Sequence, residues 1–93
     1  MTLLEVASKI GELDPELTIY AVSPWAPESP AVVTAQPEGG RGVPLEAAKN
    51  RMSYFLEVFI ARDFVEDWEA SQRPTPSAAD RCHRLIAYAT NDA

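Results

Sequence analysis

The sequence predicts a small α+β domain, in which a three-stranded antiparallel sheet carries three helices mainly on one face. The predicted order is helix, strand, strand, strand, helix, helix. Three observations predict this class: an amphipathic pattern opens the chain, two short β-branched segments follow it, and the apolar stretch 54–68 changes from a two-residue to a helical period. The 93 residues are expected to form a single domain, 1–93.

The first helix is predicted at residues 2–11. Thr2 and Glu5 have the spacing of a capping box, in which a hydroxyl and a carboxylate each accept a backbone N–H of the other residue. Gly11 fits a C-terminal cap. The apolar residues that recur at helical spacing are Leu3, Val6, Ala7 and Ile10. This stripe is expected to pack on the core.

Two strands are predicted next, at 17–22 and 31–36, and they should pair antiparallel because they are close in sequence. Turn-forming residues at 14–16 precede the first strand. Between the strands, prolines recur every third residue over 24–30, which is the repeat of polyproline II. One interpretation makes this segment a ligand for an aromatic groove, with Trp25 as anchor. The favoured one is a stiff loop with Trp25 folded back over the sheet edge.

The central stretch is predicted to be a strand that runs almost directly into a helix. From 54 to 59 the residues alternate, with Tyr54, Leu56 and Val58 on one face. The other face consists of Phe55, Glu57 and Phe59. Glu57 is then a carboxylate between two phenylalanines, and if covered it needs a partner such as Arg51, Arg62 or Tyr20. A position open to water is the simpler expectation for it.

From Ile60 the pattern becomes helical and continues to about residue 71. The competing prediction is one long helix over 44–71, with Pro44 in its first turn. Strand-then-helix is favoured, because such a helix would be about twice the usual length. In the favoured version 45–52 is a short helical or irregular link. The glycines of 39–42 match no phosphate-binding spacing.

The last helix is predicted at 78–90, after a proline-containing break. Ser77 is a suitable N-cap, and Asp80 favours the positive end of the helix. Asp80 and Arg84 lie one turn apart and could form an ion pair. The buried stripe of this helix is expected to be Ala78, Cys82, Leu85, Ile86 and Ala89.

Composition disfavours several classes of function. The net charge of -6 argues against direct binding to nucleic acid and against an anionic membrane surface. No apolar run is long enough to span a bilayer. The N-terminus carries an acid where a secretion signal would be basic, and the single cysteine excludes an internal disulfide. These features favour the cytoplasm.

The sequence offers few residues for catalysis or metal binding. Cys82 and His83 are adjacent, so on a helix they point about 100° apart and cannot share a proton well. One His and one Cys are too few for a tetrahedral zinc site. No cofactor, no metal and no catalytic residue is predicted.

The leading functional hypothesis is therefore a non-enzymatic protein-binding module. It could be an inhibitor, immunity protein or antitoxin that covers a basic partner. The candidate contact residues are Asp63, Glu66, Asp67 and Glu69 on the outer face of helix 60–71, together with Trp25. One alternative is a structural subunit or homodimer formed through sheet edges. An acid–base enzyme that uses Glu57 or the acid cluster is the least favoured.

Overall fold

The computed structural model describes residues 1–37, 43–72 and 74–92. The elements are α1 (Leu3–Ser8), β1 (Thr18–Val22), β2 (Ala31–Thr34), α2 (Leu45–Lys49), β3 (Met52–Glu57), α3 (Val58–Glu69) and α4 (Ala78–Asp92). The strands form one antiparallel sheet in the order β2-β1-β3. The predicted class and sheet are confirmed. The short helix α2 occupies the predicted link, and the glycine segment 39–42 lies outside the described residues.

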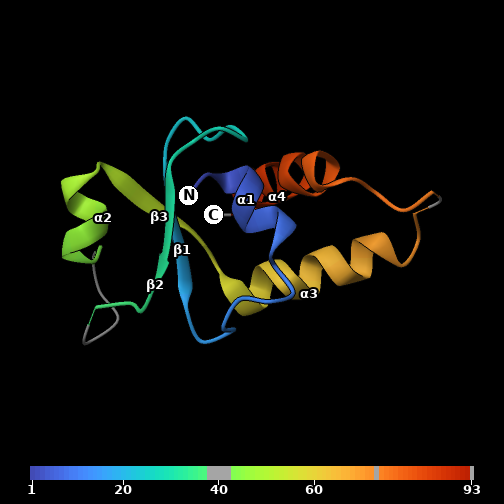
Figure 1. Ribbon diagram of the computed structural model, residues 1–93, viewed down its shortest axis with the longest axis horizontal. Helices are drawn as coiled ribbons and strands as arrows, with labels where there is room; N and C mark the ends of the chain where they lie inside the picture. Colours follow the sequence, from blue (N-terminus) through green and yellow to red (C-terminus); the bar gives the residue numbers. More distant parts are fainter. Residues whose placement is uncertain (38–42, 73, 93) are drawn as a thin grey trace.

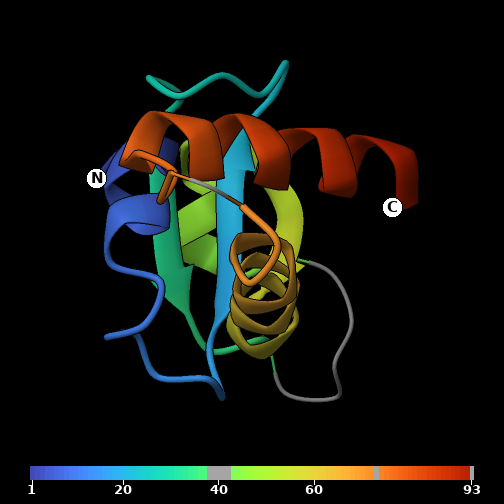
Figure 2. The same ribbon diagram turned by 90° about the vertical axis from the view of Figure 1, so that its right-hand side faces the viewer.

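The helices lie on both sides of the sheet, but unequally. Helices α1 and α4 cover one face, whereas α2 lies on the opposite side (Figure 1). Helix α4 runs across the strands (Figure 2). Helix α3 leaves the end of β3 and projects away from the sheet, and α4 extends in the same direction beside α3 (Figure 1). The molecule is 40 Å long and 23 Å wide. None of the helices over the described ranges is long and apolar enough to cross a membrane.

The core lies between the sheet and helices α1 and α4. Its buried side chains from the sheet include Ile19, Ala21, Phe55 and Leu56. Those from the helices include Leu3, Val6, Ala7, Cys82, Leu85 and Ala89. The predicted stripes are thus confirmed for most residues, but Ala78 and Ile86 are only partly buried, and Ile10 is buried beyond the end of α1. Burial of each large apolar side chain in this layer contributes about 1.5–3 kcal/mol to the free energy of folding. The layer is therefore the main source of stability.

The central stretch folds as a strand followed by a helix, and the single long helix over 44–71 is wrong. Helix α2 ends after Lys49, and Arg51 has a φ of 58°, in the left-handed region that no α-helix contains. Strand β3 then begins at Met52, two residues earlier than predicted, and α3 begins at Val58. The change from a strand period to a helical period was predicted correctly, but the strand and the helix each begin two residues earlier than predicted.

A bulge in β3 changes which of its residues share a face, so the predicted faces of this strand are wrong in part. Ile19 is opposite Leu56 and Tyr20 is opposite Tyr54, so Phe55 is an extra residue without a partner in β1. Phe55 and Leu56 are consequently both buried in the core. Glu57 is opposite Thr18, on the outer face of the sheet. The predicted placement of Glu57 between two phenylalanines is therefore wrong.

Both terminal helices begin with reciprocal caps. The Thr2 hydroxyl accepts the Glu5 N–H at 3.2 Å, and the Glu5 carboxylate accepts the Thr2 N–H at 2.9 Å, so the predicted capping box is confirmed. Ser77 and Asp80 form the same arrangement at α4. Gly11 is not the C-cap of α1, because the helix already ends at Ser8 and Lys9 is its C-cap. The expected ion pair between Asp80 and Arg84 does not form.

Candidate functional site

The outer side of α3 gathers three carboxylates. The helix turns its buried residues, Val58, Ala61 and Val65, toward the rest of the molecule. Asp63, Glu66 and Asp67 lie on the opposite side and are all exposed. We call these three residues the acidic face. Phe59, one turn before Asp63 on the same side, is 50% exposed. The surface therefore combines three carboxylates with one accessible aromatic ring.

The fourth predicted acid, Glu69, lies in a different environment. Its carboxylate forms a salt bridge with Arg81 of α4, and both side chains are about three-quarters buried. This ion pair joins the far end of α3 to α4. Among residues 1–37, 43–72 and 74–92 it is the one salt bridge found, so the acidic face has no intramolecular basic partner there. The structure therefore separates Glu69 from the other three acids.

The positions of the acids on α3 are electrostatically unfavourable for the helix. Acids stabilise the N-terminal end of a helix and bases its C-terminal end. Helix α3 has no acid in its first turn and no base in its last, while Glu66, Asp67 and Glu69 lie in its last turn. Asp63 also faces Glu66 and Asp67 at three- and four-residue spacing, where each like-charge pair costs roughly 0.2–0.5 kcal/mol. The arrangement thus weakens the helix that carries it.

Trp25 is not part of this surface. Its indole Nε1 donates to the Ala21 carbonyl at 3.4 Å, and its ring meets Phe55 edge-on. The favoured interpretation, Trp25 folded back on the sheet, matches these contacts. The loop is compact rather than extended, since the Ser29 N–H donates to the Ala26 carbonyl at 2.9 Å. In both views this loop lies above α4, whereas α3 lies below it (Figures 1 and 2).

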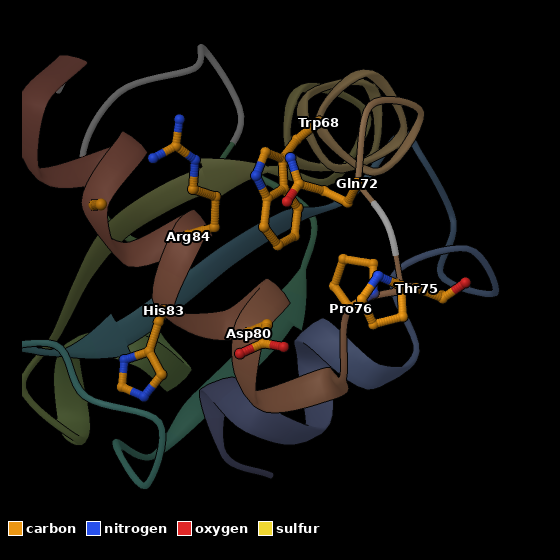
Figure 3. Close-up of a pocket in the computed structure, with 9 residues that line it drawn as sticks. Trp68, Gln72, Thr75, Pro76, Asp80, His83 and Arg84 are labelled. Atoms are coloured by element: carbon orange, nitrogen blue, oxygen red, sulfur yellow. The ribbon is translucent and has the colours of Figure 1, made fainter.

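A groove of about 560 Å³ lies between the end of α3 and α4. Figure 3 shows Trp68 and Gln72 on one wall, Thr75 and Pro76 at one end, and Asp80, His83 and Arg84 along α4. The imidazole of His83 and the guanidinium of Arg84 point in different directions (Figure 3). Arg84 lies over the Phe64 ring, 5.8 Å from its centroid. Within the described lining, these two basic side chains therefore do not converge on one point.

Cys82 is a core residue. It is 1% exposed, and burial, assisted by the charge of Glu28, raises the pKa of its thiol to about 11. The thiol is thus protonated and sheltered at neutral pH, which does not suit a nucleophile. His83, by contrast, is exposed. No group of three His, Cys, Asp or Glu that could hold a metal ion occurs within the described part of the chain.

A polar pocket of about 320 Å³ lies at the outer face of the sheet, where β3 becomes α3. It is lined by Pro15, Glu16, Leu17, Thr18, Gln36, Glu57 and Phe59. Glu57 is half-buried there, and the Gln36 amide donates to its carboxylate at 3.5 Å. Arg62, suggested as a partner of Glu57, donates instead to the carbonyls of Ile10 and Leu13.

Sequence reasoning missed most of this pocket. It named Glu57 and offered Tyr20 as a neighbour, but it did not connect Glu16, Thr18 or Gln36 with them. The available signal was the alternation in β1, where Thr18 and Tyr20 lie on one face and Ile19 and Ala21 on the other. That alternation predicts a polar group on the outer face, but the pairing of β1 with β3 was needed to bring Glu57 to it.

The outer edge of β2 is partly covered by the chain itself. The Ala31 N–H donates to the Met1 carbonyl at 2.7 Å, and the Met1 amino group donates to the Ala31 carbonyl at 3.3 Å. Thr2 and Pro30 form a further bridge. Ala31 therefore offers no free backbone groups to a second copy, which weakens the argument for a dimer through this edge.

Comparisons of the chain with protein-family models, with curated proteins and with solved structures gave no match.

Proposed function

We propose that this chain is a non-enzymatic protein-binding module whose acidic face contacts a basic partner protein. The observation that carries the proposal is the position of the acids on α3. Asp63, Glu66 and Asp67 lie together where their mutual repulsion disfavours them, and the helix dipole also disfavours Glu66 and Asp67 in the last turn. Charge for solubility alone could lie anywhere on the surface at lower cost. A local violation of helix electrostatics is typical of a binding surface.

The surroundings of the acidic face also suit a docking surface. Helix α3 projects from the body of the molecule, which leaves its outer side accessible (Figure 1). The exposed ring of Phe59 provides an apolar contact beside the charges. A basic patch on the partner, such as one that binds an anionic substrate, would complement this surface, so the module would act as an inhibitor, immunity protein or antitoxin. We place the interaction in the cytoplasm, a reducing compartment that suits a chain with one buried cysteine.

The proposal is tested by comparing two variants with equal net charge. One replaces the acidic face (Asp63→Asn, Glu66→Gln, Asp67→Asn). The control replaces three exposed acids elsewhere (Asp14→Asn, Glu28→Gln, Glu46→Gln). Each tagged protein captures its partner from a host extract at low salt, and the affinity of the identified partner is then measured with purified proteins as salt is raised.

A basic partner should bind the natural chain in a salt-sensitive manner. The acidic-face variant should lose at least tenfold in affinity, about 1.4 kcal/mol, while the control loses much less. Equal losses in the two variants would mean that only total charge matters. An unchanged affinity in the acidic-face variant would exclude this surface as the contact.

A further inference from the structure

Strand β3 forms an open edge of the sheet. In the order β2-β1-β3 it has a neighbouring strand on one side only. The opposite edge differs, because Met1 covers Ala31 there through two hydrogen bonds. An uncovered edge strand presents N–H and C=O groups that can pair with another strand. The edge of β3 is therefore the one that a further strand can join.

The pairing of β1 shows which residues of β3 face outward. The Val22 N–H donates to the Pro30 carbonyl at 3.0 Å, so Val22 directs its backbone groups toward the side of β2. This direction alternates along a strand, so Tyr20 does the same. Met52 is opposite Val22 and Tyr54 is opposite Tyr20, and in such pairs the backbone groups point away from each other. The N–H and C=O groups of Met52 and Tyr54 therefore point out of the sheet.

A pocket of about 540 Å³ opens beside the same part of β3. Its lining includes Ser53 and Tyr54 of β3, Ala89 and Thr90 of α4, and Pro24 and Trp25 of the loop after β1. No charged side chain lines it within the described parts of the chain. Two aromatic rings and a proline, with a few hydroxyl groups, suit one large apolar or aromatic side chain.

The register places this pocket under an added strand. Ser53 is opposite Ala21, which is buried in the core between the sheet and the helices α1 and α4. Ser53 therefore faces the side of α4, and a residue paired with Ser53 from outside faces the same side. Helix α4 extends past β3 over that position (Figure 2). The side chain of the residue that pairs with Ser53 would thus enter the pocket.

We propose that Met52–Tyr54 accepts an extended segment of the basic partner as a fourth, antiparallel strand, with one large apolar side chain in the pocket. Two residues of the segment would bond to the backbone of Met52 and Tyr54, and the residue between them would fill the pocket. Glu57 ends β3 and the acidic face follows on α3, so charge complementarity places basic residues before the apolar one in the segment. The basic partner comes from the proposed function, whereas the capacity of the edge to add a strand does not depend on it.

A single segment suits this edge better than a second copy of the chain. Antiparallel pairing of two β3 edges relates the copies by a two-fold axis perpendicular to the sheet, which puts both α4 helices on one face. Because α4 extends past β3, each helix would compete for the space over the strand of the other copy (Figure 2). An extended segment brings no such helix.

The edge is tested first with a peptide alone. The probe is the acetylated and amidated peptide KKTVFTV, in which two lysines precede a phenylalanine. The backbone amides of the isotopically labelled chain are followed by NMR as the peptide is added. We expect the amide signals of Met52 and Tyr54 to shift and their hydrogen exchange to slow, with a dissociation constant on the order of 0.1–1 mM.

Two control peptides separate the main-chain bonds from the pocket. The first is N-methylated at the residues on either side of the phenylalanine, which removes the donors that face Met52 and Tyr54. It should bind at least tenfold more weakly. The second has serine in place of the phenylalanine and should bind about tenfold more weakly, because it leaves the pocket unfilled. Equal affinity of the N-methylated peptide would overturn strand addition, and equal affinity of the serine peptide would overturn the pocket assignment.

A matched pair of chain variants carries the test to the partner. Ser53→Lys puts a long charged side chain at the pocket and should abolish binding of the natural peptide. Ala35→Lys makes the same change of charge at an exposed residue just after β2 and should bind within twofold of the natural chain. Thermal unfolding confirms that each variant is folded. The two variants and the acidic-face variant are then compared for affinity to the partner protein.

The outcomes separate this inference from the proposed function. Partner affinity that falls at least tenfold in Ser53→Lys and in the acidic-face variant, but not in Ala35→Lys, would support both. Equal partner affinity in Ser53→Lys and Ala35→Lys would overturn the edge as a partner contact. A loss in Ser53→Lys with no effect of the acidic-face variant would leave the edge and exclude the acidic face. Sedimentation of the natural chain as a dimer that Ser53→Lys dissociates would assign the edge to a second copy and overturn the inference.

Discussion

Trp25 packs edge-on against Phe55, with ring centroids 4.8 Å apart and ring planes at 84°. The contact joins the loop after β1 to the bulge of β3, and the hydrogen bond from the indole to Ala21 fixes its orientation. The same loop accepts the first N–H groups of α1, at the carbonyls of Ser29 and Pro27. The loop that carries Trp25 thus joins the start of α1 to β3, and Trp25 makes the contact with β3.

Replacing Trp25 with alanine should lower the free energy of unfolding by about 2 kcal/mol. The half-buried ring would leave a gap over Phe55 and lose its hydrogen bond to Ala21. Trp25→Phe, which keeps an aromatic ring, should lose less. Urea unfolding followed by circular dichroism measures both. A Trp25→Ala chain with normal stability but weakened partner binding would instead make this residue a binding anchor.

The features that the sequence predicted are those decided within a few residues. The capping box of Thr2 with Glu5 and the N-cap at Ser77 follow from spacing alone, although the second hydrogen bond of the α4 cap, from the Ser77 N–H to Asp80, was not predicted. The apolar stripes of α1 and α4 follow from helical periodicity. The change of period after the aromatic stretch correctly separated a strand from a helix. Each of these signals depends on local hydrogen bonds or on which side of one element is apolar.

The features that were missed depend on contacts between distant segments. Phe55 and Leu56 are adjacent and both buried, which simple alternation forbids and only a bulge against β1 permits. The hydrogen bonds of Arg62 could not be predicted from the sequence, because the acceptors are backbone carbonyls more than 45 residues earlier in the chain. For the candidate site, exposure of Asp63, Glu66 and Asp67 followed from the pattern, but the pairing of Glu69 with Arg81 required the packing of α3 against α4.

The capping box of α1 should contribute measurably to stability. Thr2→Ala removes the oxygen that accepts the Glu5 N–H, and such a loss costs about 1 kcal/mol. Thr2→Ser keeps the hydroxyl and should stay within a few tenths of a kcal/mol of the natural chain. Thermal unfolding compares the two. Equal melting temperatures for Thr2→Ala and Thr2→Ser would show that the cap does not stabilise the fold.

The acidic face should cost stability in the free protein. Removing its charges (Asp63→Asn, Glu66→Gln, Asp67→Asn) relieves two like-charge pairs and the unfavourable position of Glu66 and Asp67 near the helix C-terminus. We expect the free energy of unfolding to rise by about 0.5–1 kcal/mol at low salt, and the gain to shrink in high salt because charges are screened. Urea unfolding at two salt concentrations tests this. A loss of stability at low salt would remove the electrostatic argument for the proposed surface.

Arg62 should stabilise the turn between α1 and β1. Its guanidinium donates to the carbonyls of Ile10 and Leu13, across a sequence separation of about fifty residues. Arg62→Ala leaves both half-buried carbonyls without this donor and should cost about 2 kcal/mol. Arg84→Ala is the control, since an exposed cation over a ring contributes at most about 1 kcal/mol. Hydrogen exchange should locate the effect of Arg62→Ala at residues 9–17; a uniform change would contradict it.

The buried thiol of Cys82 should make stability depend on alkaline pH. Burial raises its pKa from 9.0 to about 11, so the folded state favours the neutral thiol. Once the pH exceeds 9.0, the unfolded chain releases this proton first, and unfolding becomes easier. The loss of stability should accumulate as pH rises from 9.0 and level off near 11, where the folded protein also ionises.

Cys82→Ala isolates this effect from the tyrosines and lysines that titrate in the same range. The variant is expected to be less stable at neutral pH, because it leaves a small cavity beside Leu85 and Ala89. Its stability should nevertheless fall less steeply between pH 9.0 and 11 than that of the natural chain. Urea unfolding at several pH values measures the two curves. Parallel curves would mean that the folded and unfolded chains ionise this thiol equally, and that Cys82 is more accessible than its burial indicates.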